Sequence, residues 1–380
     1  EDVKKRFDRA QFNVEKFKTL SDIKHIPLLK KKELIFLQSI GPRLGGLLTK
    51  DIGELKRIFL SPGPIFDPED RMDDYWGYTE AFDSVGFRPG DVGQVTFNYH
   101  LSPAGLMFEE PLRNLGCASI PAGPTDPGTQ LDIMQKLRVS GYVGTASYLM
   151  HLAQKAEEKG INLRKDLFQE VAFVTGERLS EKMRNQLEKK FDIILRQGYG
   201  TADVGCIGYE CFHKTGLHIS NRCYVEICHP DTGIPLKDGE VGEIVVTSFN
   251  KTYPLIRLAT GDLSYIDRAP CACGRTSPRL GSIVGRVDTT ARIKGMFVYP
   301  HQVEQVMARF EDIKRWQIEV INPGGIDEMI LYVEASNFHQ EDELLHLFRE
   351  RIKLRPELKV LAPGTLPPQI KPIEDKREWD

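Results

Sequence analysis

Residues able to do chemistry follow a short apolar run in the middle of the chain. The run Phe191–Arg196 carries β-branched residues and predicts a buried strand, and the amphipathic stretch Ser180–Lys190 before it predicts a helix capped by Ser180. The stretch Gln197–Asp203 (QGYGTAD) comes next and combines glycines, a tyrosine, a hydroxyl and an acid. In open α/β sheets, ligands bind beyond the carboxyl ends of strands, where glycine lets the backbone approach them. The pattern indicates a ligand-binding loop, and an ordinary tight turn is the alternative.

Further segments extend this pattern in chain order. A predicted strand ends in glycine and an acid at 171–177 (VAFVTGE). RLATGD at 257–262 then precedes GRVD at 285–288 and KGMFVYP at 294–300. In this order the set resembles the adenylate-forming enzymes of the acyl-CoA synthetase (AMP-binding) superfamily, specifically the phenylacetate–CoA ligase branch. The resemblance covers nearly the whole chain and rests on the ordered series, since no single motif is decisive.

The organisation of the chain suits an α/β fold. Helices and strands alternate over residues 75–145, which predicts a largely parallel sheet. We expect a large AMP-binding domain over 1–288, with mostly parallel sheets and a β-rich subdomain at about 205–288. The β-α-β-β-α-β pattern of residues 289–380 predicts a small ferredoxin-like α+β domain. The resemblance implies that this domain is a lid with its hinge at Asp288.

The resemblance implies the activity of an AMP-forming acid–CoA ligase. ATP with Mg²⁺ would convert a small aryl carboxylate to an acyl-adenylate, and CoA would then take the acyl group. Such a site must hold the nucleotide and neutralise the charge that develops on the α-phosphate.

The family's site roles fall on particular residues of this chain. The nucleotide would be bound by Gly176, Glu177, Gly198, Tyr199, Gly200, Thr201, Asp262, Arg286 and Lys294. Tyr199 would stack on adenine and Asp262 would accept the ribose hydroxyls. Asp203 stands where the family's magnesium-binding acid is usually Glu, and Thr201 and Asp203 would take part in catalysis. A surface salt bridge is the alternative for Arg286 and Lys294.

The phosphate-binding loop departs from the family pattern. The family has a loop rich in Ser, Thr and Gly that ends in Lys, and its backbone N–H groups converge on the anion. Here residues 61–70 read SPGPIFDPED, so Ser61 and Gly63 are the expected phosphate contacts. Each proline lacks an N–H group, and the acids at positions 67, 69 and 70 are expected to repel phosphate.

The C-terminal lysine of the family is a second departure. The register set by Arg377 places Glu374 where the family has a Lys that bridges the carboxylate and the α-phosphate. Lys371 and Lys376 lie close by, and Lys376 is the candidate catalytic residue. Two alternatives therefore stay open: a degenerate member that binds AMP or acyl-adenylate without efficient ligase activity, and an adenylating enzyme with an acceptor other than CoA.

Cysteine and histidine residues indicate a separate metal site. Cys271 and Cys273 form a close pair in a turn, and Cys211 with His218 forms another. Tetrahedral zinc accepts three thiolates and one imidazole, so the two pairs predict a structural zinc site, although the C-x-C spacing is shorter than usual. Cys206 is an alternative ligand, and four unliganded side chains are the alternative to a metal.

The composition limits which cell compartments and which kinds of partner are expected for this protein. A net charge of −3 with both signs interspersed, and no apolar run of the ~20 residues that span a bilayer, give no sign of nucleic acid or membrane binding. Seven cysteines at irregular spacing predict a reducing cytoplasm. The expected partners are the carboxylate, ATP and CoA, and the family suggests a homodimer. The charged start is unlike a signal peptide, and because residue 1 is not Met we expect the sequence to begin late.

Overall fold

The protein divides into two compact units. The computed structural model describes residues 2–10, 12–61, 64–287, 291–293, 296–323 and 328–377. Unit 1 comprises Glu1–Thr260 and Tyr265–Ser282, and unit 2 comprises Gly261–Ser264 and Ile283–Asp380. The predicted hinge, Asp288, lies outside the described residues.

A large sheet runs through unit 1 with the strand order β14-β15-β10-β9-β8-β7-β6-β4-β5. Its strands are β4 (Val92–Val95), β5 (Ala118–Ile120), β6 (Gly141–Gly144), β7 (Val171–Val174), β8 (Ile194–Thr201), β9 (Gly205–Glu210), β10 (Leu217–Ile219), β14 (Ile266–Asp267) and β15 (Arg279–Leu280). Strands β5, β4, β6, β7 and β8 are parallel neighbours, whereas β9 joins β8 antiparallel. All residues of β6 and β7 are buried, as expected for parallel strands covered on both faces.

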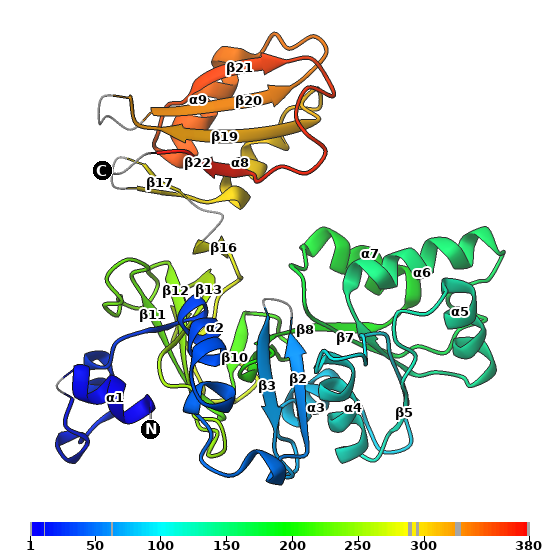
Figure 1. Cartoon of the computed structure of the whole chain (residues 1–380). Helices are drawn as coiled ribbons and strands as arrows, with labels where there is room; N and C mark the ends of the chain where they lie inside the picture. The colour runs from blue at the N-terminus through cyan, green and yellow to red at the C-terminus, as the bar shows by residue number, and fades with distance from the viewer. Residues whose placement is uncertain are drawn as a thin grey trace. The chain divides into compact units, whose positions relative to one another are not determined.

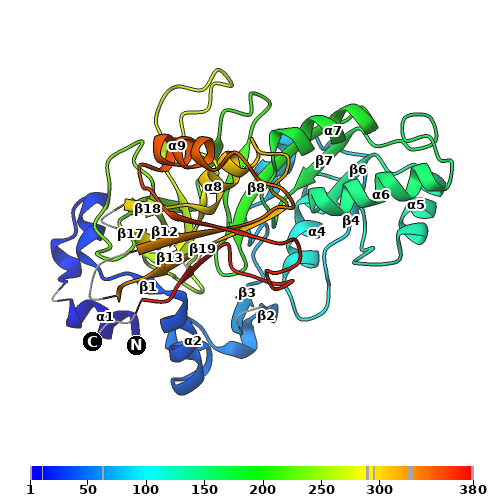
Figure 2. The ribbon, with the colours of Figure 1, turned by 90° about the horizontal axis from the view of Figure 1, so that it is seen from above.

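Helices cover both faces of the parallel half of this sheet (Figure 1). One face carries α3 (Thr79–Val85) and α4 (Ala104–Asn114), and the other carries α5 (Pro127–Lys136), α6 (Ala146–Glu158) and α7 (Glu181–Phe191). Seen from above, α5, α6 and α7 lie side by side (Figure 2). The Ser180 hydroxyl accepts the N–H of Met183 at 3.2 Å, which confirms the predicted cap of α7. The alternation of β and α elements confirms the predicted α/β fold.

The N-terminal segment and most of a second sheet complete unit 1, and the rest of that sheet, residues 261–264 and 285–286, belongs to unit 2. The sheet order is β1-β13-β12-β11, and β16 also pairs with β13. These strands are β1 (Leu29–Lys30), β11 (Cys223–Cys228), β12 (Gly242–Ser248), β13 (Leu258–Ser264) and β16 (Gly285–Arg286). The N-terminal segment contains α1 (Asp2–Arg9), α2 (Lys31–Ile40), the hairpin of β2 (Arg57–Ser61) and β3 (Ile65–Glu69), and 3₁₀ turns at Val14–Lys16, Leu20–His25, Arg43–Gly46 and Ile52–Glu54.

Unit 2 is a small α+β unit with its own core. Its elements are β17 (Ala291–Ile293), β18 (Met296–Val298), α8 (Pro300–Met307), β19 (Arg315–Ile321), β20 (Glu328–Glu334), α9 (Glu341–Ile352), β21 (Glu357–Leu361) and β22 (Ile373–Asp375). The sheet order is β21-β20-β19-β22, and Val303 of α8, Leu331 of β20 and Phe348 of α9 are buried in one core between sheet and helices. The strands before α8 form a separate hairpin, and β22 takes the sheet edge beside β19. Within the described residues of both units, no helix is long and apolar enough to cross a membrane.

Candidate nucleotide site and cysteine cluster

The predicted ligand-binding segment is part of a strand. We expected a strand over Phe191–Arg196 and a loop from Gln197, but α7 continues to Phe191 and β8 extends through Thr201. β8 forms a hairpin with β9, and the register shifts between Tyr199 and Gly200. The expectation of a loop was wrong because the glycines, which usually weaken a strand, are required here by close packing.

Two glycines of β8 leave no room for a side chain. A Cβ atom on Gly198 would lie 2.4 Å from Cζ of Phe173, and one on Gly200 would lie 2.2 Å from the Gly205 carbonyl oxygen. Contacts this short are not tolerated, so the backbone can take this path only with glycine. The hairpin therefore packs backbone against backbone beside Tyr199.

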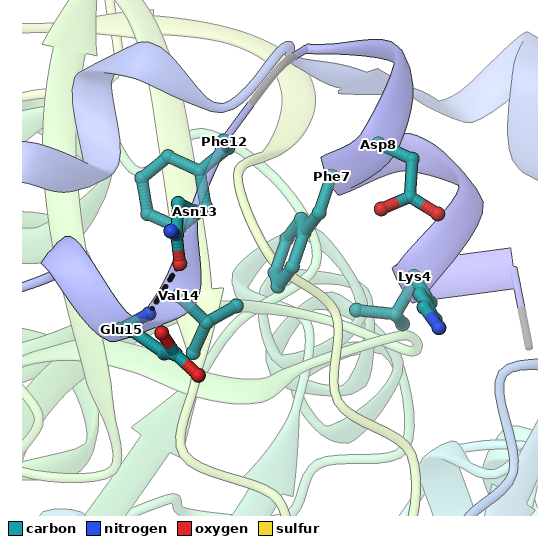
Figure 3. A pocket seen from close by; sticks show the side chains of 8 residues that line it. Lys4, Phe7, Asp8, Phe12, Asn13, Val14 and Glu15 are labelled. Carbon is teal, nitrogen blue, oxygen red and sulfur yellow. Dashed lines mark hydrogen bonds between the residues drawn. The ribbon is translucent and has the colours of Figure 1, made fainter.

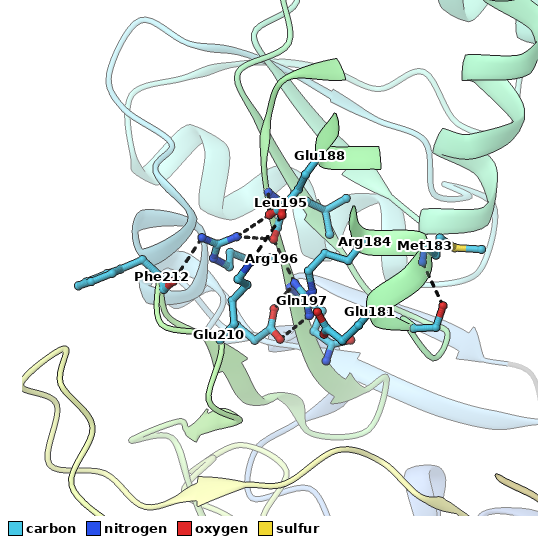
Figure 4. Close-up of polar contacts among 11 residues, drawn as sticks. Glu181, Met183, Arg184, Glu188, Leu195, Arg196, Gln197, Glu210 and Phe212 are labelled. Carbon is cyan, nitrogen blue, oxygen red and sulfur yellow. Dashed lines mark hydrogen bonds and ion pairs between the residues drawn. The ribbon is translucent and has the colours of Figure 1, made fainter. Parts of the chain in front are cut away.

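A buried ion pair fixes β8 just before these glycines (Figure 4). Arg184 of α7 donates from Nη1 and Nη2 to the two carboxylate oxygens of Glu210, on β9, at 2.8 and 2.6 Å. Glu210 also accepts the backbone N–H of Gln197 at 2.8 Å, and Arg184 donates to the Leu195 carbonyl at 3.1 Å. Sequence reasoning did not single out this pair. The sequence did contain a signal for it: Arg184 lies on the same helix face as Leu187, three residues later. A charge on that buried face requires an ionic partner.

Tyr199 and Thr201 both carry hydroxyls at the end of β8. The Tyr199 hydroxyl donates to Oγ1 of Thr260, on β13, at 3.3 Å. Thr260 in turn donates to the Ile244 carbonyl of β12 at 3.0 Å. Oγ1 of Thr201 accepts the N–H of Val204 at 3.3 Å, which closes the turn into β9. Tyr199 is half-buried, so part of its ring stays accessible to a ligand.

Asp262 and Arg286 are directly opposed on neighbouring antiparallel strands. Arg286 donates from Nη1 to Oδ1 of Asp262 at 2.9 Å. Gly261 has a φ of +83°, and a Cβ there would lie 3.0 Å from Nη2 of Arg286, so glycine lets the guanidinium approach the strand. The salt bridge considered for Arg286 is present. The predicted partner Lys294 lies outside the described residues.

Gly176 and Glu177 follow β7 as predicted, and the carboxylate of Glu177 already has local partners. It accepts the backbone N–H of Ser147 at 2.6 Å and the Ser147 hydroxyl at 2.7 Å. These bonds satisfy donors in the first turn of α6, which Thr145 also caps. Gly176 has a φ of +83°, a conformation that favours glycine. This pair therefore shapes the end of β7 and presents little side-chain chemistry of its own.

Asp203 is held by Lys31 and keeps one unpaired oxygen. Nζ of Lys31, in the first turn of α2, lies 2.8 Å from Oδ2 of Asp203, whose side chain is only 2% exposed. Oδ1 of Asp203 is buried and has no hydrogen-bond partner. Carboxylate oxygens are the ligands that Mg²⁺ takes from proteins. The residue thus fits the magnesium role assigned by the resemblance.

The segment that replaces the phosphate loop begins with an ordered hairpin. The Ser61 hydroxyl is buried and donates to the Ile65 carbonyl at 3.3 Å. Gly63 lies outside the described residues.

Two of the three hairpin acids have cationic partners. Glu69 lies 2.8 Å from Lys56 and 3.0 Å from Arg57, and Asp70 lies 2.8 Å from Lys50. Glu69 and Asp70 are thus neutralised locally, which weakens the repulsion of phosphate that we expected from them.

Lys376, the candidate catalytic residue, is ion-paired within unit 2. Its Nζ lies 2.6 Å from Oε2 of Glu319 and 3.5 Å from Oε2 of Glu374. Hydrogen bonding to Glu319 raises the pKa of the lysine, so the ammonium stays charged at neutral pH. The side chain is 48% exposed and the pair is therefore weak. Glu374, on β22, faces the amide of Gln317 at 3.4 Å.

The predicted zinc ligands come together. One ligand atom from each of Cys211, His218, Cys271 and Cys273 lies within 4.8 Å of the others. Sγ of Cys211 is 3.7 Å from Sγ of Cys271, and Nε2 of His218 is 3.3 Å from Sγ of Cys273. A tetrahedron with ~2.3 Å zinc–sulfur bonds has sulfur–sulfur edges of about 3.8 Å. The spacing therefore suits a tetrahedral metal.

The surroundings of the cysteine cluster favour metal binding. Nδ1 of His218 lies 3.3 Å from the Ser277 hydroxyl, a contact that orients Nε2 toward the thiols. Burial opposes ionisation of Cys271, but hydrogen bonds from the Cys273 backbone and the Thr215 hydroxyl outweigh it and lower the pKa of the thiol to about 5. The alternative ligand Cys206 lies on β9 outside this cluster.

A cavity in the N-terminal segment lies away from these residues. It has a volume of about 770 Å³ and is formed by the N-terminal segment, with Phe7, Phe12 and Val14 among its lining residues (Figure 3). Asn13 caps the following turn by accepting the N–H of Glu15 at 2.9 Å. The lining of this cavity is mostly apolar and contains none of the predicted site residues.

Comparison with known proteins identifies the class. The model of the AMP-binding enzyme family matches residues 104–251, and the model of the AMP-binding enzyme C-terminal domain matches residues 295–377. A crystal structure of 2-hydroxyisobutyryl-CoA ligase, in an open conformation with 2-HIB-AMP and CoA, aligns with a TM-score of 0.85 at 22% identity, over 98% of this chain and 86% of that one. The chain thus has the fold of adenylate-forming enzymes.

Full-length relatives narrow the class to a family. The phenylacetate–coenzyme A ligase of Thermus thermophilus is 30% identical over 95% of this chain and 86% of its own length. The enzyme of the same name from Escherichia coli K12 is 26% identical over 96% of this chain and 87% of its own length. This chain belongs to the phenylacetate–coenzyme A ligase family, as the ordered motifs predicted.

Proposed function

We propose that the protein converts a small aryl carboxylate into its CoA thioester in two steps. The carboxylate oxygen attacks the α-phosphate of ATP, which gives an acyl-adenylate and releases pyrophosphate. The sulfur of CoA then attacks the acyl carbon, and AMP leaves with its phosphate oxygen. Family membership supports this reaction class, and the observation that carries it is the strand segment Gln197–Thr201, whose glycines at 198 and 200 leave no room for a side chain beside Tyr199.

The residues described above have distinct proposed roles. The half-buried ring of Tyr199 would stack on adenine, and the glycine backbone of β8 would lie close to the α-phosphate. Asp262 would accept the ribose hydroxyls in charge-assisted bonds, with Arg286 holding its carboxylate in place. Asp203 would hold Mg²⁺, which would neutralise phosphate charge. The lid role of unit 2 and the hinge stay predictions.

ATP–pyrophosphate exchange tests the first step. Exchange needs no CoA, so it isolates adenylation, and a panel of aryl and short aliphatic acids would reveal the substrate class. We expect acid-dependent exchange that falls about 100-fold or more in Asp262→Ala, because charge-assisted contacts to the nucleotide are lost. Asp238→Ala is the matched control, since its carboxylate forms only an exposed ion pair with Arg268. Exchange that survives Asp262→Ala would remove that residue from the site.

A second candidate function is nucleotide binding without efficient turnover. Two observations favour it: Glu374 stands at the position of the family's catalytic lysine, and Ser61 is buried in a hairpin. Calorimetry with AMP, run beside the exchange assay, separates the two functions. Clear AMP binding without exchange for any acid would select the second candidate. Exchange without release of a CoA thioester would instead point to a different acceptor.

Lys376 can be tested within the same assay. Lys376→Met should leave folding intact, because an ion pair this exposed contributes at most about 1 kcal/mol. We expect exchange to fall at least about tenfold if this ammonium contacts the reacting phosphate. Lys359→Met is the control, since Lys359 forms a comparable exposed pair with Glu357.

We also infer that the cluster of Cys211, His218, Cys271 and Cys273 holds structural zinc. Four protein ligands would fill a tetrahedral site and leave no open position for catalysis. The seven cysteines are unpaired, which supports a reducing compartment such as the cytoplasm. The homodimer stays a prediction that sedimentation would test.

A further inference from the structure

Asp67 is a buried acid on β3 and is 1% exposed. Among the residues that the structure describes, neither of its carboxylate oxygens has a hydrogen-bond partner. The neighbouring acids Glu69 and Asp70 have lysine or arginine partners, so the hairpin does not leave its acids unpaired in general. Buried polar atoms are nearly always satisfied, and a buried carboxylate is costly without a counter-charge. A group absent from the polypeptide would satisfy it.

A second acid lies within electrostatic reach of Asp67. Burial, and then the charge of Asp203, raise the pKa of Asp67 to about 8, and the Ser61 hydroxyl and then the charge of Lys31 oppose this. Oδ1 of Asp203 is likewise buried without a partner. Lys31 contacts only Oδ2 of Asp203, so three carboxylate oxygens of the two acids stay unpaired. If both acids are ionised, one ammonium faces two carboxylates, and a bound cation would balance the remaining negative charge in the interior of unit 1.

We propose that Asp67 and Asp203 together bind a divalent cation, with the β2–β3 hairpin supplying Asp67 as a second carboxylate ligand. The inference rests on the proposed function, in which Asp203 alone has the magnesium role. Magnesium is usually held by one or two carboxylates together with substrate phosphates, so two acids fit its preference.

The proposed site gives the unusual hairpin a function. A phosphate loop cradles its anion with N–H groups, whereas Pro64 lacks one and Ser61 is used internally. An acid in the hairpin binds metal instead, and the metal can then bind phosphate oxygens. Asp67 would also compensate for the shorter reach of Asp203 relative to Glu. Lys31 stays beside the metal as a second positive charge.

Binding of Mn²⁺, measured by electron paramagnetic resonance without nucleotide, tests this site. Zinc-loaded protein should be used, because thiolates prefer zinc and would otherwise offer a competing site. We expect one bound Mn²⁺ that Mg²⁺ displaces. Asp67→Asn and Asp203→Asn should each weaken it about tenfold or more, since loss of even outer ligands costs 10–100-fold. Asp67→Glu should retain part of the affinity. Asp73→Asn, an exposed acid beyond the hairpin, should change nothing.

Asn at position 67 imitates a protonated, neutral acid and separates the two explanations. If Asp67 is simply neutral, Asp67→Asn binds Mn²⁺ as the wild type does, and the proposal is overturned. Failure of the wild type to bind Mn²⁺ at millimolar concentration overturns it as well.

The exchange assay keeps this inference separate from the proposed function. If the wild type catalyses exchange and Asp67→Asn binds Mn²⁺ unchanged, only the two-acid site is excluded. If Mn²⁺ binding needs both acids but the protein catalyses no exchange, only the ligase function is excluded. Urea unfolding of each variant, measured alongside, verifies that a lost signal is not a lost fold.

Discussion

Arg184 and Glu210 form a two-point ion pair in the interior of unit 1, with exposed side-chain fractions of 1% and 4%. The pair ties α7 to β9, and through the N–H of Gln197 it also ties both to β8. The strand that carries Tyr199 is thus fixed by one charge-assisted cluster just before its glycines. We regard Arg184 as a positioning residue for the nucleotide site.

Replacing Glu210 with Gln should be strongly destabilising. The guanidinium of Arg184 would stay buried without its counter-charge, which costs about 3–5 kcal/mol in measured cases. Urea unfolding gives the free-energy difference, and the KM for ATP in the exchange assay should rise as β8 loosens. Glu181→Gln is the matched control, because Glu181 meets the same arginine from a position that is 70% exposed. A Glu210→Gln protein as stable as the wild type would disprove the role of this pair.

Gly200→Ala should disturb the hairpin of β8 and β9. The added methyl group would meet the Gly205 carbonyl oxygen and the Tyr78 hydroxyl, each at 2.2 Å. We expect a loss of about 1–3 kcal/mol, as for other overpacked sites, with weaker AMP binding by calorimetry. Gly53→Ala serves as the comparison, since a Cβ there has no neighbour within 4 Å. Equal effects of the two changes would contradict the proposed close packing.

Zinc content should be one equivalent per chain and should depend on the cysteine cluster. Cys273→Ser removes one ligand, and we expect loss of bound zinc by mass spectrometry together with a lower melting temperature. Chelation of the wild type should have the same effect, because metal binding adds to folding stability. Cys117→Ser is the control, since Cys117 lies outside the cluster, just before β5. Zinc retained by Cys273→Ser would exclude that thiol as a ligand.

The stability contributed by Asp70 should depend on pH in the acid range. Burial alone would raise the pKa of Asp70, but hydrogen bonds from Lys50, Thr252 and the Arg71 N–H outweigh it and lower the pKa to about 2. The folded pKa thus lies below the unfolded value of about 3.9. The contribution is fully present above pH ~4 and is lost as pH falls toward 2.

Urea midpoints of the wild type and Asp70→Asn should therefore differ at pH 7 and converge as the buffer is made acidic. Asp73→Asn, an exposed acid, should follow the wild type throughout. A difference that stays constant from neutral to acid pH would show that the loss is not electrostatic.

Local signals in the sequence predicted much of the fold. Ser180 and the apolar spacing after it located α7, and the ordered motifs indicated the family. The cysteine cluster was also predictable, because two short-range pairs each carry their own spacing. The extension of β8 through Gly200 was not, because its glycines are explained only by Phe173 and Gly205 on neighbouring strands.

Contacts between distant residues could not be read from the sequence. Lys31, in the N-terminal part of unit 1, forms an ion pair with Asp203. The residues next to each of them in the sequence do not indicate this contact. The hairpin that contains Ser61 and Asp67 was interpreted as an acidic loop, because its sequence contains several prolines. Its strands pair with each other, but its acids meet residues that come much later in the chain, such as Thr252, whose hydroxyl donates to Asp70.

The cysteine cluster also has a consequence for the order of events during synthesis. Cys211 and His218 precede β11, whereas Cys271 and Cys273 follow β13. The cluster therefore joins the start and the end of the chain segment that forms most of the second sheet. A ribosome adds residues one after another, and domains fold as their last segments emerge. The proposed metal site cannot close until Cys273 has left the exit tunnel. A nascent chain of unit 1 would therefore wait, with two of the four proposed ligands in place, for the late turn that supplies the other two.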